Sequence, residues 1–490
     1  MTSNLPAWAG SVDADALARL LALYSEQDWL DYKRQCDISS TRGLVEFAKD
    51  AGAMMITGGY ILVGADDNGQ PTGDVEHPGL FDPATLHAKL AKYLPKPFEI
   101  RSASHSYQGQ SYALIYVVPH LDGFCVFECD GAYWDGKSQI VIFRAGDVFA
   151  RHGTRSERWN QRDITMIKQR LQTDADRGRD QQAEASNLLH GIPQQLGGSG
   201  LWLGMAVVPE HRLTDVAMIN PDTAQQFLQD WQFAQAPIDG FSLGSATYRQ
   251  PGGVVITNQA ANADPPHWWR LALYDAGDAA GAYVLAHQVA ANPLTDDKQW
   301  YGLPQIISDG QTISARRDEV EIRLLTLLDI LTAHAANVGA GGSALVTAML
   351  LGPHTDAWAR IALLSELVDD SGQRQGWHLA STRAQQSVND AVMVPIVHRV
   401  HLADMRDTTM RLRTAHRLAA DLLAIFGIDQ PAMLRPEGTL DPYGSATDHQ
   451  QIVYQHARHL GLPVDPVSPL ERRQQYEDTV RAAKEQLRQR

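Results

Sequence analysis

The sequence is poor in the features that mark secreted and membrane-spanning proteins. Its 490 residues include only three cysteines, which is typical of an intracellular protein without disulfides. No apolar run approaches the ~20 residues that a transmembrane helix needs. The first residues lack a basic stretch followed by an apolar core, so we expect no signal peptide. The sequence therefore predicts a cytoplasmic protein that does not bind a membrane.

The chain also lacks the excess of basic residues that a nucleic-acid coat protein carries. Its formal net charge is -15, which argues against such a protein but does not exclude an enzyme that acts on nucleic acid. Residues 1–170 hold 17 Lys+Arg against 21 Asp+Glu, and the remaining residues hold 25 against 36. Because most of the acidity lies in the later part, we expect any polyanion to bind the N-terminal part.

Common nucleotide-binding and zinc-binding patterns are missing as well. Neither a GxGxxG pattern nor a Walker pattern is present, so the glycines are better explained by turns and strand packing. Cys125 and Cys129 lie on an apparent strand at 124–129, but no second pair completes a zinc site. We interpret them as buried structural thiols.

Residues 1–171 show the pattern of a mixed α+β domain with a largely antiparallel sheet. Helices are expected to begin at Asp13, at Ser39, Ser40 or Thr41, and at Asp82. Asn68-Gly69 is typical of a tight turn after a buried strand. The predicted helices are 13–24, 39–55, 82–94 and 160–171, and the predicted strands are 29–33, 59–66, 98–107, 111–119, 124–129 and 139–146.

The later residues predict a linker and a second α+β region. Residues 172–200 are polar and rich in turn formers, which indicates a linker. Residues 201–490 form an α+β region of unknown fold, and the glycines near 338–342 suggest a break into two subdomains. The predicted strands are 201–209, 253–259, 268–275, 281–290, 344–352 and 392–402, and the predicted helices are 318–337, 408–426 and 470–490.

Acidic side chains and a lysine gather in the first seventy residues. Glu26, Asp31 and Lys33 lie close together in SEQDWLDYKRQ, and Asp67 follows the strand at 59–66. Carboxylates are the ligands that Mg²⁺ and Mn²⁺ prefer, and a bound metal can activate water against a phosphodiester. Lys33 follows Asp31 by two residues, so on a strand both point to one face, where the lysine could contact the phosphate.

Simpler explanations exist for each of these residues. Asp67 is a natural turn former, Glu26 could be a surface charge at a helix end, and Asp31 with Lys33 could be an exposed ion pair on an edge strand. Four arginines could position phosphate groups or could be solvated surface residues. They are Arg34, Arg144, Arg151 and Arg155.

In their order along the chain, residues 26–158 resemble the Schlafen AlbA-like domain family, also called AlbA-type or divergent AAA. The resemblance covers about a quarter to a third of the chain, and the order and spacing of its motifs are more specific than any one motif. The matching elements are Glu26, Asp31-Tyr32-Lys33, a helix through Phe47-Ala48, the segment from Gly58-Gly59-Tyr60 to Gly64-Ala65-Asp66-Asp67-Asn68-Gly69, and Phe143-Arg144-Ala145-Gly146.

The resemblance implies a metal-dependent endoribonuclease, a hydrolase that cleaves phosphodiester bonds in RNA such as tRNA and that acts in antiphage defence. It implies that Glu26, Asp31 and Asp67 bind Mg or Mn and that Lys33 assists catalysis. A homo-oligomer, a dimer or larger, would supply the second lobe that surrounds the RNA in related nucleases.

The sequence departs from the family pattern at two places. Asp31 stands where the nucleases carry Glu, and AGAMMITGG replaces an Asn-bearing turn before the double glycine. The shorter carboxylate reaches less far toward a metal. The alternative is a non-catalytic module that binds nucleic acid or a nucleotide and serves as a regulator or a defence scaffold.

Overall fold

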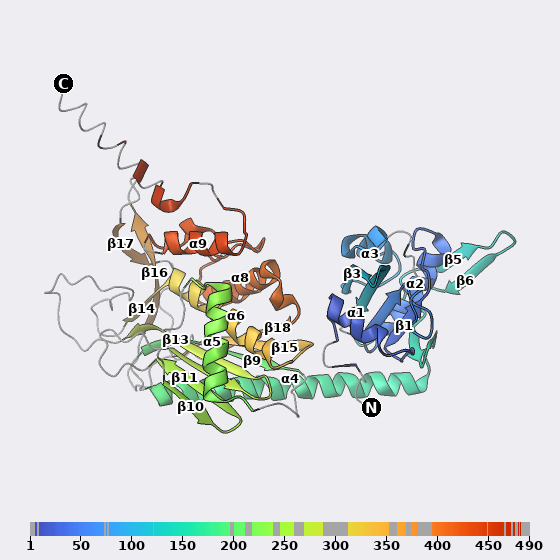
Figure 1. Cartoon of the computed structure of the whole chain (residues 1–490), viewed down its shortest axis with the longest axis horizontal. Helices are drawn as coiled ribbons and strands as arrows, with labels where there is room; N and C mark the ends of the chain where they lie inside the picture. Colours follow the sequence, from blue (N-terminus) through green and yellow to red (C-terminus); the bar gives the residue numbers. More distant parts are fainter. Residues whose placement is uncertain are drawn as a thin grey trace. The chain divides into compact units, whose positions relative to one another are not determined.

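The computed structural model divides the chain into two compact units, Met1–Arg179 and Asp180–Arg490 (Figure 1). Helices and several sheets occur in both, which confirms the predicted α+β class. The structure describes residues 5–6, 9–72, 75, 78–120, 122–196, 200–210, 218–238, 246–258, 269–287, 312–351, 360–368, 374–379, 394–447, 449–464, 467–471, 474–475, 479 and 481.

Unit 1 is built on a four-stranded sheet with the order β1-β2-β4-β3. β1 is an edge strand that runs parallel to β2, while β2 with β4 and β4 with β3 are antiparallel. The expectation of a largely antiparallel sheet is thus confirmed. The strands are β1 Leu30–Lys33, β2 Gly59–Val63, β3 Ile100–Tyr107 and β4 Gln110–Val117.

Helices cover both faces of this sheet. One face carries Ile61, Val63 and Ile115 and packs against α2 and α3. The opposite face carries Tyr60 and Leu62 and packs against α1. Because side chains alternate along a strand, both faces of β2 are buried, which explains its unbroken apolar sequence. The helices are α1 Ala14–Leu21, α2 Thr41–Met54 and α3 Pro83–Leu90, with a short 3-10 turn η1 Pro78–Phe81.

The predicted helix starts are confirmed in detail. The side chains of Asp13, Ser40 and Asp82 each accept a hydrogen bond from a backbone N–H in the first turn of α1, α2 and α3. This contact satisfies one of the donors that a helix start leaves open. The helix ends were predicted less well, because α1 stops at Leu21 and α3 at Leu90.

The predicted strand at 124–129 is wrong, since this segment is an irregular loop. Its apolar residues are explained by core packing, because Phe127 is buried and its ring stacks on Phe143 with centroids 3.8 Å apart. The expectation that Cys125 is buried is confirmed, while Cys129 is partly exposed.

Two small hairpins complete the unit, and the first projects from it in Figure 1. They are β5 Gly131–Trp134 with β6 Gln139–Phe143, and β7 Phe149–His152 with β8 Arg155–Arg158.

Helix α4, Gln161–Leu196, replaces most of the expected linker. The prediction of a helix ending at 171 and a linker at 172–200 was based on polar composition. The helix continues because its later turns bury Ala185, Leu189 and Ile192, and because Gln181 donates a hydrogen bond to the carbonyl of Val208. A few apolar residues at helical spacing therefore outweigh many polar ones.

Unit 2 contains a seven-stranded sheet with the order β10-β11-β12-β13-β9-β15-β18. All of its neighbouring strands are antiparallel. A separate sheet has the order β14-β16-β17. The strands are β9 Gly200–Pro209, β10 Ala246–Gln250, β11 Gly253–Asn258, β12 Trp269–Tyr274, β13 Ala279–His287, β14 Thr312–Arg316, β15 Ser343–Leu351, β16 Arg360–Val368, β17 Arg374–Leu379 and β18 Ile396–His401.

Helices lie on both faces of the seven-stranded sheet (Figure 1). Trp202 and Ala206 of β9 face the later turns of α4, while Leu203 and Met205 share a core with α5, α6 and α8. The helices are α5 Pro221–Gln235, α6 Arg317–Asn337, α8 Thr408–Ala424 and α9 Gln450–His459, with 3-10 turns η2 Asp404–Arg406 and η3 Pro442–Gly444.

The expected subdomain break near 338–342 is a turn within one core. β15 follows this turn and pairs directly with β9 along its length, and residues on both sides of the turn belong to the same hydrophobic cluster.

The predicted helix at 470–490 lies for the most part outside the described residues. None of the helices that the structure describes is long and apolar enough to span a membrane.

Helix α6 was predicted as an apolar helix, yet it buries several acids. Glu321 has no exposed surface, and its carboxylate accepts hydrogen bonds from the backbone N–H groups of Ala432 and Met433 at 2.8 Å and of Leu434 at 3.0 Å. Burial raises the pKa of Glu321, and the three N–H groups oppose this shift. Arg317 lies 3.5 Å from the same carboxylate. Glu321 thereby holds the 432–434 segment against α6.

We predict that Glu321→Gln lowers the free energy of unfolding of unit 2 by about 2 to 3 kcal/mol. The glutamine amide has only one oxygen to accept the three backbone N–H groups, and its NH₂ group would face one of these donors. Urea unfolding followed by tryptophan fluorescence measures this loss, and amide exchange should rise in a peptide covering 432–434. The matched control is Glu437→Gln, because Glu437 is exposed on the same segment. Equal stability of the two variants would contradict the assigned role of Glu321.

Candidate functional site

The edge strand β1 carries the charged cluster of unit 1. On the side away from β2, the backbone N–H and C=O groups of β1 have no neighbouring strand to pair with, and side chains form hydrogen bonds with them instead. The carboxylate of Glu26 accepts a hydrogen bond from the N–H of Tyr32 at 3.0 Å, and Arg151 of β7 donates one to the carbonyl of Leu30 at 3.3 Å. The short turn that includes a bridge between Gln27 and Leu30 places Glu26 beside the strand.

Asp31 and Lys33 point to the face of the sheet that α2 covers. The ammonium nitrogen of Lys33 lies 2.8 Å from Asp31 Oδ2 and 2.7 Å from Asp50 Oδ2. The guanidinium of Arg151 lies 3.2 Å from Asp31 Oδ1. Asp50 also accepts a hydrogen bond from the hydroxyl of Ser156 at 2.8 Å. Strand β1, helix α2 and the β7–β8 hairpin therefore meet at this ion cluster.

Within the cluster, Glu26 is the group whose pKa is shifted toward neutral pH. Burial acts to lower the pKa of Lys33, but the charges of Asp50 and Asp31 outweigh it and the pKa is raised. The lysine thus remains charged. Burial, followed by the charge of Asp31, raises the pKa of Glu26 to about 7. A hydrogen bond between the two carboxyl groups contributes to this shift, so Glu26 exchanges its proton near neutral pH.

Asp67 occupies a different position from Glu26 and Asp31. It is exposed in the 66–70 turn, and no hydrogen bond or ion pair joins it to another described residue. The neighbouring Asp66 shapes the turn, because its carboxylate accepts the N–H groups of Asn68 and Gln70 at 3.0 and 2.9 Å. Gly69 has a φ of 71°, as a tight turn of this kind requires.

The 66–70 turn lies against the segment that precedes Glu26. A Cβ atom on Gly69 would be 3.3 Å from the Cα of Tyr24 and 3.2 Å from the hydroxyl of Tyr32. The turn therefore borders the site, although no hydrogen bond or ion pair joins Asp67 to the described carboxyl pair.

The predicted metal ligands do not fit a metal site as they are arranged. Both oxygens of Asp31 already face cations, Lys33 on one side and Arg151 on the other, so a third cation there would be repelled. Across the part of the chain that the structure describes, no group of three or more His, Cys, Asp or Glu residues is placed to hold a metal ion. Glu26, Asp31 and Asp67 are not joined into one ligand set, and we derive no step through a metal.

The four arginines divide into one buried residue and three exposed ones. The side chain of Arg151 is only 4% exposed, so it positions Asp31 and the backbone of β1 and does not reach a phosphate. Arg34, Arg144 and Arg155 are exposed. Arg34 directly follows Lys33, and Arg155 directly precedes Ser156. The carbonyl of Arg34 accepts a hydrogen bond from Thr72, which follows the 66–70 turn.

Sequence reasoning missed Asp50 and Ser156. Asp50 lies in the last turns of α2, where a buried acid is unfavourable without a partner. Its place among apolar residues of the sequence was the feature that could have indicated a buried and paired carboxylate. Nothing in the local sequence of Ser156 distinguishes it from other exposed hairpin residues. Cys36 is also close to the cluster, and burial raises the pKa of its thiol to about 12, so it is neutral and unreactive.

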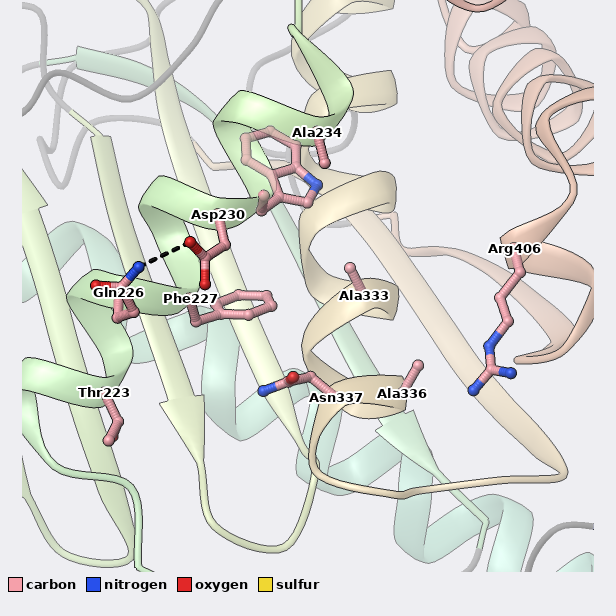
Figure 2. Close-up of a pocket in the computed structure, with 10 residues that line it drawn as sticks. Thr223, Gln226, Phe227, Asp230, Ala234, Ala333, Ala336, Asn337 and Arg406 are labelled. Carbon is pink, nitrogen blue, oxygen red and sulfur yellow. Dashed lines mark hydrogen bonds between the residues drawn. The ribbon is translucent and has the colours of Figure 1, made fainter. Parts of the chain in front are cut away.

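Unit 2 offers a second candidate location, a groove of about 530 Å³. Figure 2 shows Phe227 and Asp230 of α5 on one side, Ala333 and Asn337 of α6 on the other, and Arg406 at the far rim. Asp230, the one carboxylate among the described residues that line it, accepts a hydrogen bond from Gln226 at 2.7 Å. The groove has room for a ligand, but the contacts of its lining side chains do not indicate a reaction.

Comparison with known proteins adds little to this geometry. No protein-family model matches the sequence, and no curated protein matches it. Among solved structures, the DIP2311 protein from Corynebacterium diphtheriae is 14% identical, with a TM-score of 0.19 over 43% of this chain. The match spans 30% of the length of that protein. At this score and identity it carries no argument about fold or function, so the candidate site depends on its own residues.

Proposed function

We propose that unit 1 cleaves phosphodiester bonds in RNA and that the carboxyl pair of Glu26 and Asp31 performs the acid–base chemistry. The observation that supports this proposal best is the contact between a half-buried Glu26 and the buried Asp31 beside Lys33 at an edge strand. Two carboxyl groups in contact do not both ionise easily, and one of them is therefore available to take up a proton at neutral pH.

Asp31 serves to tune Glu26. Its carboxylate lies between Lys33 and Arg151, and its negative charge disfavours a second one on Glu26. Glu26 is less buried than Asp31 and is the member of the pair that a substrate can approach. Glu26 is therefore the general base of the proposed reaction, and Asp31 is a positioning residue.

The proposed step needs no metal, because RNA carries its own nucleophile. Glu26 removes the proton from a ribose 2′-hydroxyl, and the 2′-oxygen attacks the adjacent phosphorus. A bond forms between phosphorus and the 2′-oxygen, and the bond to the 5′-oxygen breaks. The departing oxygen takes a proton from water, and the hydroxide left behind recovers the proton held by Glu26. The products are a 2′,3′-cyclic phosphate and a 5′-hydroxyl. The exposed Arg34 is available to contact the phosphate.

The second candidate function is a non-catalytic module that binds nucleic acid or a nucleotide. The observation in its favour is that Lys33 bridges Asp31 and Asp50 and so joins β1 to α2, which is what a purely structural ion cluster does. Loss of activity in a Lys33 variant would not identify catalysis, since removing this lysine takes away the cation that two buried carboxylates share. The predicted homo-oligomer and the antiphage role stay predictions, and the dependence on Mg or Mn that the family resemblance implies is the alternative to our metal-free step.

We predict that the protein cleaves purified tRNA in the presence of EDTA and leaves DNA intact. Glu26→Gln should reduce the cleavage rate by about 100-fold or more, which is the usual contribution of a general base. The rate should rise with pH through about 7, where Glu26 loses its proton. Gel analysis of cleavage and end-group analysis of the 2′,3′-cyclic phosphate measure these outcomes.

The matched control is Asp67→Ala, which changes an exposed acid outside the carboxyl pair. It should cleave at a rate within about threefold of the wild type, as surface substitutions usually do. Cleavage that requires Mg²⁺ or Mn²⁺ and disappears in Asp67→Ala would contradict our mechanism and favour the metal site that the family resemblance implies. No cleavage of any substrate would favour the non-catalytic module.

We further predict that Glu26→Gln stabilises unit 1 at high pH. The pKa of Glu26 is about 7 in the folded protein and 4.5 for an unperturbed glutamate. The folded state therefore binds more protons between these values, and its stability falls as pH rises through this window. Glutamine stays neutral and can still accept the N–H of Tyr32.

The variant and the wild type should unfold at similar temperatures at pH 5, while the variant should unfold about 1 to 2 °C higher at pH 8. Calorimetry of the full chain and amide exchange in a peptide covering 26–33 measure the difference. A difference in unfolding temperature that is the same at both pH values would contradict the raised pKa of Glu26.

A further inference from the structure

Tyr24 combines two features that do not help the chain to fold. Its φ is 53°, in the left-handed region that residues other than glycine rarely adopt. The residue is 63% exposed, although a large aromatic residue is usually at least half-buried. A glycine or asparagine at this position would relieve the backbone, and a polar residue would suit the exposure.

The other positive φ values of non-glycine residues have local causes. Gln108, with a φ of 51°, lies with Gly109 in the two-residue turn between β3 and β4, where a hairpin needs this conformation. Ala236, with a φ of 41°, is the C-cap of α5, a common place for a left-handed residue. Tyr24 also follows a helix end, because the N–H of Leu23 donates to the carbonyl of Leu20 in the closing turn of α1, but here the left-handed residue is a large and exposed aromatic.

Tyr24 is next to the candidate site on two sides. It precedes Glu26 by two residues, and its Cα packs against Gly69 in the 66–70 turn. Arg34 is fixed beside the same turn by the hydrogen bond from Thr72 to its carbonyl at 3.3 Å, and its side chain is exposed. An exposed aromatic ring and an exposed guanidinium thus border the carboxyl pair. A nucleotide could stack its base on the ring and place its phosphate at the guanidinium.

We propose that Tyr24 is a substrate-binding residue whose ring stacks on an unpaired base of the RNA next to the bond that is cleaved. The inference rests on the proposed function, since it takes RNA as the ligand of this site. The strained backbone is then explained as the means by which the ring is held outward beside Glu26, in keeping with the tendency of strained residues to occur at functional sites. Stacking accepts any base, so this contact gives affinity without sequence specificity.

The experiment measures RNA binding in full-length protein that carries Glu26→Gln, so that cleavage does not interfere. The probe is a fluorescein-labelled, unstructured 12-residue oligouridylate, and fluorescence anisotropy gives Kd. Adding Tyr24→Leu should weaken binding about 5- to 100-fold, which is the range for loss of one stacked base. Adding Tyr24→Phe should leave Kd within about twofold, because phenylalanine keeps the ring.

Two controls separate binding from folding. Tyr24→Gly should weaken binding as Tyr24→Leu does, yet should not lower the unfolding temperature, because glycine removes the backbone strain. Gln108→Gly makes the same change of backbone at an exposed turn and should leave Kd unchanged. An oligonucleotide with abasic sites should bind the Glu26→Gln parent and its Tyr24→Leu variant equally, because it has no base to stack.

The outcomes distinguish this inference from the proposed reaction. Weaker binding in Tyr24→Leu without any cleavage by the wild type would support the stacking role and reject the catalytic one. Cleavage by the wild type with equal Kd values for Tyr24→Leu and its parent would reject the stacking role alone. Absence of RNA binding in the parent, or a Tyr24→Gly variant that unfolds at a clearly lower temperature, would also overturn the inference.

Discussion

The ammonium group of Lys33 lies between the carboxylates of Asp31 and Asp50, and the candidate site depends on this contact. Two buried carboxylates, one on β1 and one on α2, would repel each other without the lysine. Arg151 adds a second cation from β7. The raised pKa of Glu26 comes first from its burial and then from the charge of Asp31, which this ion cluster holds beside it.

Much of the fold could be predicted because local signals and tertiary packing agree. The caps Asp13, Ser40 and Asp82 set the starts of their helices, and the apolar run after Gly59 forms a strand that is buried on both faces. Prediction failed where packing opposes local pattern. The loop at 124–129 is apolar because Phe127 enters the core, and α4 extends through a polar segment because a few of its residues are buried.

The site was predicted in part for a similar reason. Spacing along one strand places Asp31 and Lys33 on one face, and this was confirmed by their 2.8 Å contact. Asp50 and Arg151 reach the same point from α2 and β7, and only the packing of these elements brings them there. Asp67 follows its strand as expected and its turn borders the site, but Asp67 is exposed there, because sequence spacing does not determine the direction in which a turn presents its side chains.

The order of strands in the larger sheet has a consequence for synthesis on the ribosome. β9 pairs with β13 on one side and with β15 on the other, so its second partner ends about 140 residues later in the chain. At normal elongation rates this takes roughly 7 to 30 s. During that time the apolar strand of the nascent chain lacks one neighbour, and the emerging polypeptide must be shielded from association with other chains until Leu351 has left the ribosome.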